Sequence, residues 1–406
     1  MKVDWKKVKL GEIATFSNGV NFGKESYTSG VKLIGVSNFG NKYFPEYDEL
    51  EEINEKVLRE NDYLKDGDIV FVRSNGNKEL VGRCMLIQNP PSPVTYSGFC
   101  IRARLNDTVT NNPRFFAYYF KSKIFRKSMS NSAVGANIQN LNQGLLSSHE
   151  ISLPPLETQQ KIASILSAYD DLIENNRKQI KLLEEAAQRL YKEWFVDLRF
   201  PGYENVAIVD GAPEGWRIGT LGDLGNIITG KTPSKKNERY YGSAIPFVKI
   251  PDMHDCIYPI TTEECLSLEG ANSQKNKFIP PESLIVSCIG TAGLVNIAFE
   301  LCQTNQQINS IICNNNDTLY YLYFFIKSKR EYLNALGSNG ATMVNVNKEK
   351  FGRIEILIPS EFVIEKFKYV VKPYFEKIKS LQQQIQLLQQ ARDKLLPRLM
   401  SGEMEV

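Results

Sequence analysis

The chain has 406 residues, of which 42% are hydrophobic and 11% aromatic, a composition typical of globular rather than disordered protein. It contains no apolar run near the roughly 18 to 20 residues that cross a bilayer, and its first residues lack the apolar core of a signal peptide. We therefore expect a cytoplasmic protein with no membrane partner. The formal net charge of +3 excludes a general basic excess, so binding of nucleic acid needs local basic patches or charge from partners.

The most informative feature of the sequence is an internal repeat. Trp5 and Gly19 recur, at one constant separation, as Trp216 and Gly230. The correspondence continues to the end of the chain, in the pairs Asn140-Leu141-Asn142 with Asn345-Val346-Asn347 and Ile180-Lys181-Leu182-Leu183 with Ile385-Gln386-Leu387-Leu388. A duplicated unit of roughly 200 residues predicts two similar modules that hold two related targets.

Inside each module the pattern is that of an α+β fold. Short β-rich runs alternate with loops rich in Asn, Gly and Ser, and longer apolar stretches follow them. We expect strands at 68–73, 245–250, 284–289 and 308–313, and helices at about 113–129 and 317–335.

Two long helices are predicted by heptad patterns, one at 157–195 and one in the C-terminal residues. The apolar seams consist of Ile162, Leu166, Tyr169, Ile173, Ile180, Leu183 and Leu190 in the first helix, and of Tyr374, Ile378, Leu381, Ile385, Leu388 and Leu395 in the second. Because the seams match, we expect an antiparallel coiled coil; the alternative is that each helix is buried in its own domain. Pro373 is expected to kink or break the second helix near its start.

Turn signals at Pro154-Pro155, Pro201-Gly202 and Pro359 divide the chain into four parts. They are a first domain at 1–155, a long helix at 156–203, a second domain at 204–360 and a second long helix at 361–406. The predicted fold class is thus α+β, with two similar globular domains separated by two long helices and related by a pseudo-twofold repeat.

Motifs for catalysis or cofactor binding are weak. Residues 225–232 match the phosphate-binding pattern Gly-x4-Gly-Lys-Thr, but Pro233 follows where that pattern needs a helix. Residues 89–92 lack the aromatic residue on which the adenine methyltransferase motif depends. Only His149 and His254 are present as histidines, the first expected at the surface or as a cap, and the seven cysteines form no Cys-x-x-Cys pair. We predict no catalytic residue, no metal site and no cofactor.

Polar loops after equivalent strands are the best candidates for a binding site. Lysine and arginine suit phosphates and guanine, whereas asparagine and glutamine pair with adenine. The candidates in the first module are Asn18, Asn21, Lys24, Arg73, Asn75, Asn77, Lys78, Asn137 and Gln139. Those in the second are Lys231, Thr232, Ser234, Lys235, Lys236, Thr291, Asn305 and Gln306. The alternative, solvated turns, explains single residues better than a set that recurs after the same strand.

Over its whole length the chain resembles the specificity subunit of Type I restriction-modification enzymes. The resemblance rests on 153–162, which lead into the first long helix, on Arg199-Phe200-Pro201-Gly202 at its exit, and on 230–234, which open the second module. Gly290-Thr291-Ala292-Gly293 and Asn305-Gln306 are further landmarks.

This resemblance implies two target-recognition domains, each reading one half of a bipartite, asymmetric site on double-stranded DNA. The helices set the spacer between the half-sites and dock two methyltransferase subunits, and restriction subunits that act as ATP-dependent translocases and endonucleases complete the complex. The specificity subunit itself is non-catalytic. Two rival readings are a coiled-coil adaptor that holds two protein ligands without binding DNA, and a fused enzyme that binds S-adenosylmethionine or cleaves DNA by itself.

Overall fold

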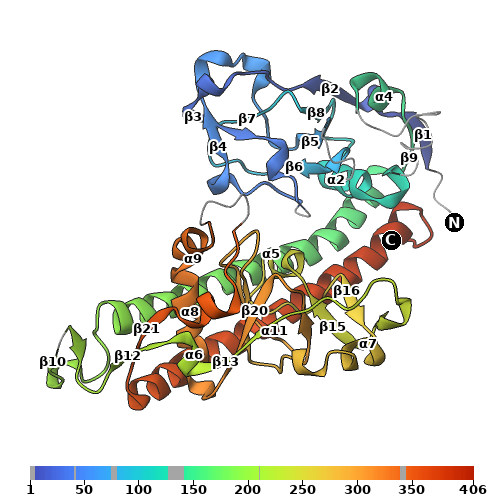
Figure 1. Ribbon diagram of the computed structural model, residues 1–406. Coiled ribbons are helices and arrows are strands. Elements are labelled where there is room, and N and C mark those ends of the chain that lie inside the picture. Colours follow the sequence, from blue (N-terminus) through green and yellow to red (C-terminus); the bar gives the residue numbers. More distant parts are fainter. Residues whose placement is uncertain (1–4, 41–42, 75–79, 127–140, 210, 339–343) are drawn as a thin grey trace. The chain divides into compact units, whose positions relative to one another are not determined.

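The computed structural model (Figure 1) describes residues 5–40, 43–74, 80–126, 141–209, 211–338 and 344–406. The chain divides into two compact units. The first unit combines Met1–Ile173 with Leu387–Val406, and the second unit is Glu174–Gln386. Each unit therefore contains one globular module and a part of both long helices. Within the described ranges, every helix is too short or too polar to span a lipid bilayer.

The first unit contains three sheets. A four-stranded antiparallel sheet has the order β2-β8-β5-β6, with β2 at Ala14–Asn18, β8 at Cys100–Leu105, β5 at Ile69–Val72 and β6 at Cys84–Leu86. A three-stranded sheet has the order β4-β3-β7, formed by Glu51–Ile53, Tyr27–Ile34 and Val94–Tyr96, and β3 and β7 run parallel. A two-stranded ribbon pairs β1, Lys6–Lys9, with β9, Glu150–Leu153.

The second unit repeats this topology. Its larger antiparallel sheet is β13-β20-β17-β18, formed by Gly225–Thr229, Ile308–Cys313, Leu284–Ser287 and Val295–Ile297. Its second sheet is β14-β16-β15-β19, formed by Tyr241–Gly242, Glu264–Leu266, Ile245–Val248 and Gln303–Thr304, again with one parallel pair, β15 and β19. The ribbon pairs β12, Arg217–Thr220, with β21, Glu355–Ile358. A separate hairpin joins β10, Ile208–Val209, to β11, Ala212–Pro213.

Equivalent backbone hydrogen bonds show that the two modules are copies of one fold. The Gly19 N–H donates to Cys100 O over 3.1 Å, and the Gly230 N–H donates to Ile308 O over 3.0 Å. In both units the bond joins the end of the edge strand, β2 or β13, to the start of the strand that pairs with it, β8 or β20. The duplication predicted from the sequence is therefore confirmed in three dimensions.

Short helices cover the sheets. The first unit has α1 at Leu10–Ile13, α2 at Pro113–Lys121 and α4 at Gln143–Ser148. The second unit has α6 at Leu221–Leu224, α7 at Leu268–Asn272, α8 at Leu319–Ser328, α9 at Arg330–Gly337 and α10 at Lys348–Gly352. The predicted helix at 113–129 is interrupted at Ser122, where the backbone is extended and the hydroxyl donates to Tyr119 O over 2.6 Å. Helical residues resume at 123–126, and 127–129 lie outside the described residues. The predicted helix at 317–335 is divided at Lys329 into α8 and α9.

The core of the first unit lies between α2 and the four-stranded sheet. Asn112 caps α2 by accepting from the Phe115 N–H over 3.1 Å, and Pro113 occupies the first turn, where its missing N–H costs no hydrogen bond. The aromatic side chains of α2 pack on the sheet, and Phe71 and Phe120 meet edge to face with ring centroids 4.9 Å apart. Leu396, Leu399 and Met400, from the end of the second long helix, are buried in this same core.

The two long helices are α5, Leu156–Tyr191, which continues as a π-helical turn at Lys192–Val196, and α11, Glu361–Met400. Within the second unit they run antiparallel. The Asn176 amide donates to Gln384 Oε1 over 3.3 Å, and further along α5 the ring of Tyr191 lies 6.4 Å from that of Phe367. Among the seam positions, Ile162, Leu166, Ile173, Ile378 and Leu381 are buried, and Tyr169, Ile180, Leu183, Leu190, Tyr374, Ile385, Leu388 and Leu395 are half-buried.

The expected break at Pro373 is wrong, because α11 continues through it. Pro373 lies on the exposed face of the helix, between the buried residues Val371 and Phe375. A proline cannot donate to the carbonyl four residues earlier, which belongs to Tyr369, whose side chain is 82% exposed. A carbonyl on this solvent-facing side can accept a hydrogen bond from water instead, while the buried neighbours Val371 and Phe375 hold the helix against the core.

A buried polar cluster joins both long helices to α2 in the first unit. The Asp170 carboxylate accepts from Arg392 Nη1 over 2.5 Å and from the Tyr118 hydroxyl over 2.5 Å. The Arg392 guanidinium also lies 5.0 Å from the centre of the Tyr43 ring, and Lys121 Nζ lies 3.9 Å from that centre. Burial lowers the pKa of Lys121 to about 8. In the other repeat, the positions of Asp170 and Arg392 hold the buried apolar residues Phe375 and Ala187.

Candidate nucleic-acid interface

Three loops of the second unit meet at one end of its larger sheet. The loop 231–236 follows β13, the loop 290–293 follows β17, and 305–307 connects β19 to β20. The Lys231 N–H donates to Thr304 O over 2.9 Å, and the Cys288 N–H donates to Gln307 O over 2.8 Å. Because the three strands are adjacent, backbone hydrogen bonds alone bring together loops that are far apart in the sequence.

Gly230 permits the closest of these contacts. A Cβ atom at this position would lie 2.1 Å from Asn305 O and 2.3 Å from Thr304 O, far inside van der Waals distance. The same is true of Gly19 in the first unit, where a Cβ atom would lie 2.2 Å from Ser97 O. The two glycines that mark the sequence repeat are therefore the points where the first loop crosses the backbone of the third.

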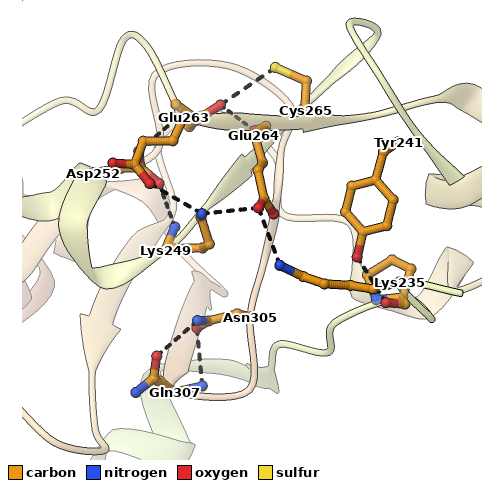
Figure 2. A network of polar contacts seen from close by, with 11 residues as sticks. Lys235, Tyr241, Lys249, Asp252, Glu263, Glu264, Cys265, Asn305 and Gln307 are labelled. Carbon is orange, nitrogen blue, oxygen red and sulfur yellow. Dashed lines mark hydrogen bonds and ion pairs between the residues drawn. The ribbon is translucent and has the colours of Figure 1, made fainter. Parts of the chain in front are cut away.

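Hydrogen bonds orient four polar side chains of the second unit's loops. The Thr232 hydroxyl donates to Gln306 Oε1 over 2.6 Å. Asn305 donates from Nδ2 to Gln307 Oε1 over 3.0 Å and accepts the Gln307 N–H over 3.1 Å (Figure 2). Among the predicted residues, Lys231, Ser234, Lys235, Lys236, Thr291 and Gln306 are exposed, Thr232 is half-buried and Asn305 is buried.

Two side chains that sequence analysis did not identify donate hydrogen bonds to the backbone at the start of the first loop. The buried Gln274 donates from Nε2 to Lys231 O over 2.8 Å and to Gln303 Oε1 over 2.7 Å. Lys277 Nζ donates to Thr229 O over 2.9 Å. Lys277 ends a short 3-10 helix at Lys275–Lys277, which Gln274 precedes, and this helix is too short for a periodic pattern to associate either residue with the loop.

Lys235 and Lys249 converge on one carboxylate beside this loop (Figure 2). Lys235 Nζ lies 3.3 Å, and Lys249 Nζ 3.5 Å, from Glu264 Oε1, and Lys249 Nζ also lies 3.3 Å from Glu263 Oε2. Partial burial lowers the pKa of Lys249, but the hydrogen bond to Glu263 and the charges of both glutamates outweigh it and raise that pKa overall. The cluster therefore holds two ammonium groups and two carboxylates with no net charge.

The first unit places its loops in the same way. Asn18, Asn21 and Lys24 are exposed at and after the end of β2, and the half-buried Arg73 follows β5. The Arg73 N–H donates to Phe99 O over 2.8 Å, and its Nη1 donates to Gly98 O over 3.4 Å. The other predicted residues, Asn75, Asn77, Lys78, Asn137 and Gln139, lie outside the described residues.

The third loop of the first unit is Ser97-Gly98-Phe99, which sequence analysis missed. It occupies the place of 305–307, because the Val20 N–H donates to Tyr96 O over 3.0 Å as Lys231 does to Thr304 O. The Phe99 side chain is 63% exposed and so presents a large apolar surface to solvent. The signal that could have found this loop is its position just before Cys100–Leu105, the counterpart of Ile308–Cys313.

The motifs that suggested other chemistry have structural explanations. Within 225–232, β13 is followed by extended chain, and no helix begins at Lys231. Residues 89–92 form a loop. His149 is the C-cap residue of α4, as one of the two expectations had it, but it is buried rather than exposed, and burial lowers its pKa. All seven cysteines are free thiols, five of them buried and two half-buried.

Comparisons with known proteins agree with this architecture. The family described as "Type I restriction modification DNA specificity domain" matches the chain twice, at residues 2–185 and 213–390. The Type I restriction enzyme HindI specificity subunit of Haemophilus influenzae is 31% identical, over 98% of this chain and 99% of that protein. The MjaIX specificity subunit of Methanocaldococcus jannaschii is 27% identical, over 99% and 94%.

A solved structure shares the fold. The S subunit of the Type I restriction-modification system of M. genitalium superposes with a TM-score of 0.58 at 17% identity, over 98% of this chain and 96% of that one. The two family matches coincide with the two structural repeats, and together they cover most of the sequence. The chain therefore belongs to the family of Type I restriction-modification DNA specificity proteins.

Proposed function

We propose that the three loops at the sheet end of each unit are a DNA-reading surface, and that the two surfaces read the two halves of one bipartite, asymmetric site. The observation that carries this proposal is the repeated loop arrangement, because the same backbone hydrogen bonds position loops of unlike sequence in both units. A shared frame with different side chains is what two unlike half-sites require.

The side chains of the second unit suit contacts with both phosphates and bases. Lys231 and Lys236 are exposed ammonium groups that can neutralise phosphates. Gln306 accepts from Thr232 at Oε1, so its amide NH₂ is directed to an acceptor outside the loop, such as a purine N7. In the first unit, Arg73 offers a guanidinium for guanine or phosphate, and Phe99 offers an apolar contact for a thymine methyl group.

The remaining parts of the assignment concern organisation and partners. We assign the reading domains to 1–155 and 204–360 and the spacer helices to 156–203 and 361–406. The helices set the spacer and dock two methyltransferase subunits, which restriction subunits join in the cytoplasm. The chain is non-catalytic, and its partners supply methylation and cleavage. A second candidate function, an adaptor that holds two protein ligands, provides no role for the lysines and amides gathered at the loops.

The test is selection from a random library of DNA duplexes by the full chain assembled with its methyltransferase subunits. We expect enrichment of a single motif with two specified blocks and an unspecified spacer. Enrichment of no motif would contradict the proposal and favour the adaptor. Binding of S-adenosylmethionine by the chain alone would instead indicate that it is an enzyme.

Lys231→Ala is expected to weaken binding to every DNA sequence by a similar factor, because phosphate contacts carry no sequence information. The slope of log K against log salt concentration should become shallower by about 0.9, because one phosphate fewer is neutralised. Lys7→Ala, which removes an exposed lysine from the β1–β9 ribbon, is the matched control and should leave the slope unchanged. An unchanged slope for Lys231→Ala would remove this side chain from the interface.

A further inference from the structure

Glu264 occupies a fixed position beside the first reading loop of the second unit. It begins β16, and its backbone pairs with Phe247 of β15. The Asp252 carboxylate accepts the Lys249 N–H over 2.8 Å and the Glu263 N–H over 2.9 Å, which fixes the two segments that carry the cluster. Glu264 therefore differs from a solvated surface glutamate, because strand pairing and the Asp252 hydrogen bonds fix the backbone that carries it beside the loop.

The loop that carries Lys235 is also fixed, whereas the lysine itself is free to move. The Tyr241 hydroxyl donates to Pro233 O over 2.9 Å and anchors the backbone two residues before Lys235 (Figure 2). The Lys235 side chain is 69% exposed, against 19% for Lys249. Lys249 is thus a permanent partner of the two glutamates, and Lys235 is a partner that can leave for a nearby anion.

We propose that Glu264 is a positioning residue that holds Lys235 away from DNA until a phosphate is fixed beside it. This inference rests on the proposed function, because it assumes that the loop 231–236 faces DNA. In a loose, hydrated complex with non-target DNA, no phosphate is fixed near Lys235, and its ion pair with Glu264 persists. In the target complex, base contacts hold the duplex in register, and a phosphate at a fixed short distance replaces Glu264 as the partner of Lys235.

The size of the effect follows from the exposure of the pair. An exposed ion pair is worth up to about 1 kcal/mol, which corresponds to a roughly fivefold change in an equilibrium constant. An internal competitor of this strength suppresses a weak phosphate contact, and it lowers the affinity for target DNA by the energy of the ion pair without preventing the strong contact there. Glu264 acts through Lys235 and is therefore a positioning residue that contacts no base itself.

The experiment compares Glu264→Gln with wild type, each as the full chain assembled with its methyltransferase subunits. The probes are two labelled duplexes, one carrying the motif enriched from the library and one with that motif shuffled, each titrated at several salt concentrations. On the shuffled duplex we expect binding tighter by about twofold to fivefold and a salt slope steeper by up to about 0.9, because Lys235 becomes available. On the motif duplex binding should also tighten, by up to about fivefold because no ion pair has to break, but the slope should not change, since Lys235 already contacts phosphate there.

Two further variants separate the pair from general charge and from misfolding. Glu269→Gln removes the same charge from an exposed helical residue of the same unit that has no ion pair among the described residues, and it should leave both slopes unchanged. In a Lys235→Ala background, Glu264→Gln should have no effect on the shuffled duplex. Thermal unfolding of each assembled variant shows whether it is folded.

Three results would overturn the inference. Glu264→Gln could match Glu269→Gln on both duplexes, it could steepen the salt slope equally on both duplexes, or its effect on the shuffled duplex could survive in the Lys235→Ala background. Failure of the proposed function has a different signature, because the wild-type complex would then bind the motif and shuffled duplexes equally before any residue is changed.

Discussion

Asp170→Ala is expected to destabilise the first unit by about 3 kcal/mol, because the Arg392 guanidinium loses its buried carboxylate partner and keeps only the exposed Asp393. The Asp170 and Arg392 side chains are 5% and 11% exposed, so water cannot replace the missing carboxylate. The variant also removes the acceptor of the Tyr118 hydroxyl. Hydrogen exchange of the α2 amides, which lie in the core of this unit, measures the destabilisation as faster exchange.

The adjacent residue provides a matched control for Asp170. The Asp171 side chain is 62% exposed and lies 3.9 Å from Arg114, so Asp171→Ala should cost at most about 1 kcal/mol. The double variant Asp170→Phe with Arg392→Ala introduces the side chains found in the other repeat and should recover much of the stability, since a well-packed apolar pair can replace a buried ion pair. Equal costs for Asp170→Ala and Asp171→Ala would show that the buried cluster contributes nothing.

Gly230→Ala is expected to displace the reading loop of the second unit, because the added methyl group cannot coexist with two carbonyl oxygens closer than 2.5 Å. Such overpacking costs about 1–3 kcal/mol, and the loop must break its hydrogen bonds to Thr304 and Ile308 to relieve it. Affinity for the target should fall about tenfold or more, as for a mismatched base pair, with little change in binding to the shuffled duplex. Duplex titration and thermal unfolding measure the two effects.

Gly40→Ala is the control, since a Cβ atom there meets no other atom within 4 Å. Gly19→Ala should impair reading of the other half-site by the same mechanism, so the two glycine variants should tolerate changes in opposite blocks of the motif. If Gly230→Ala binds its target as tightly as wild type, the close approach of these loops is unimportant for recognition.

Patterns in the sequence predicted more of the fold than of the site. Heptads located α5 and α11 to within a few residues, and the strand at 308–313 has the predicted bounds, because burial along a helix or strand leaves a regular apolar period. The break expected at Pro373 did not occur, because packing of the buried neighbouring residues outweighs the tendency of proline to end a helix. Local signals are reliable where the chain's own periodicity determines the structure.

The site was predicted only in part, for the opposite reason. Lysines and amides in the loops after β13 and β17 could be found by composition and by their recurrence in two copies. Gln274 and Glu264 could not, because their roles depend on which distant segment each one meets. Polar contacts of this kind have no period, and a single sequence contains no trace of them.

The burial of Leu396, Leu399 and Met400 in the first unit has a consequence for synthesis of the protein. These side chains are synthesised after every residue of the second unit. Part of the apolar surface of the N-terminal module therefore stays uncovered until the second unit has been made. Contacts between such distant residues form slowly. A premature stop codon directly after the second unit would thus damage the part of the protein that is made first.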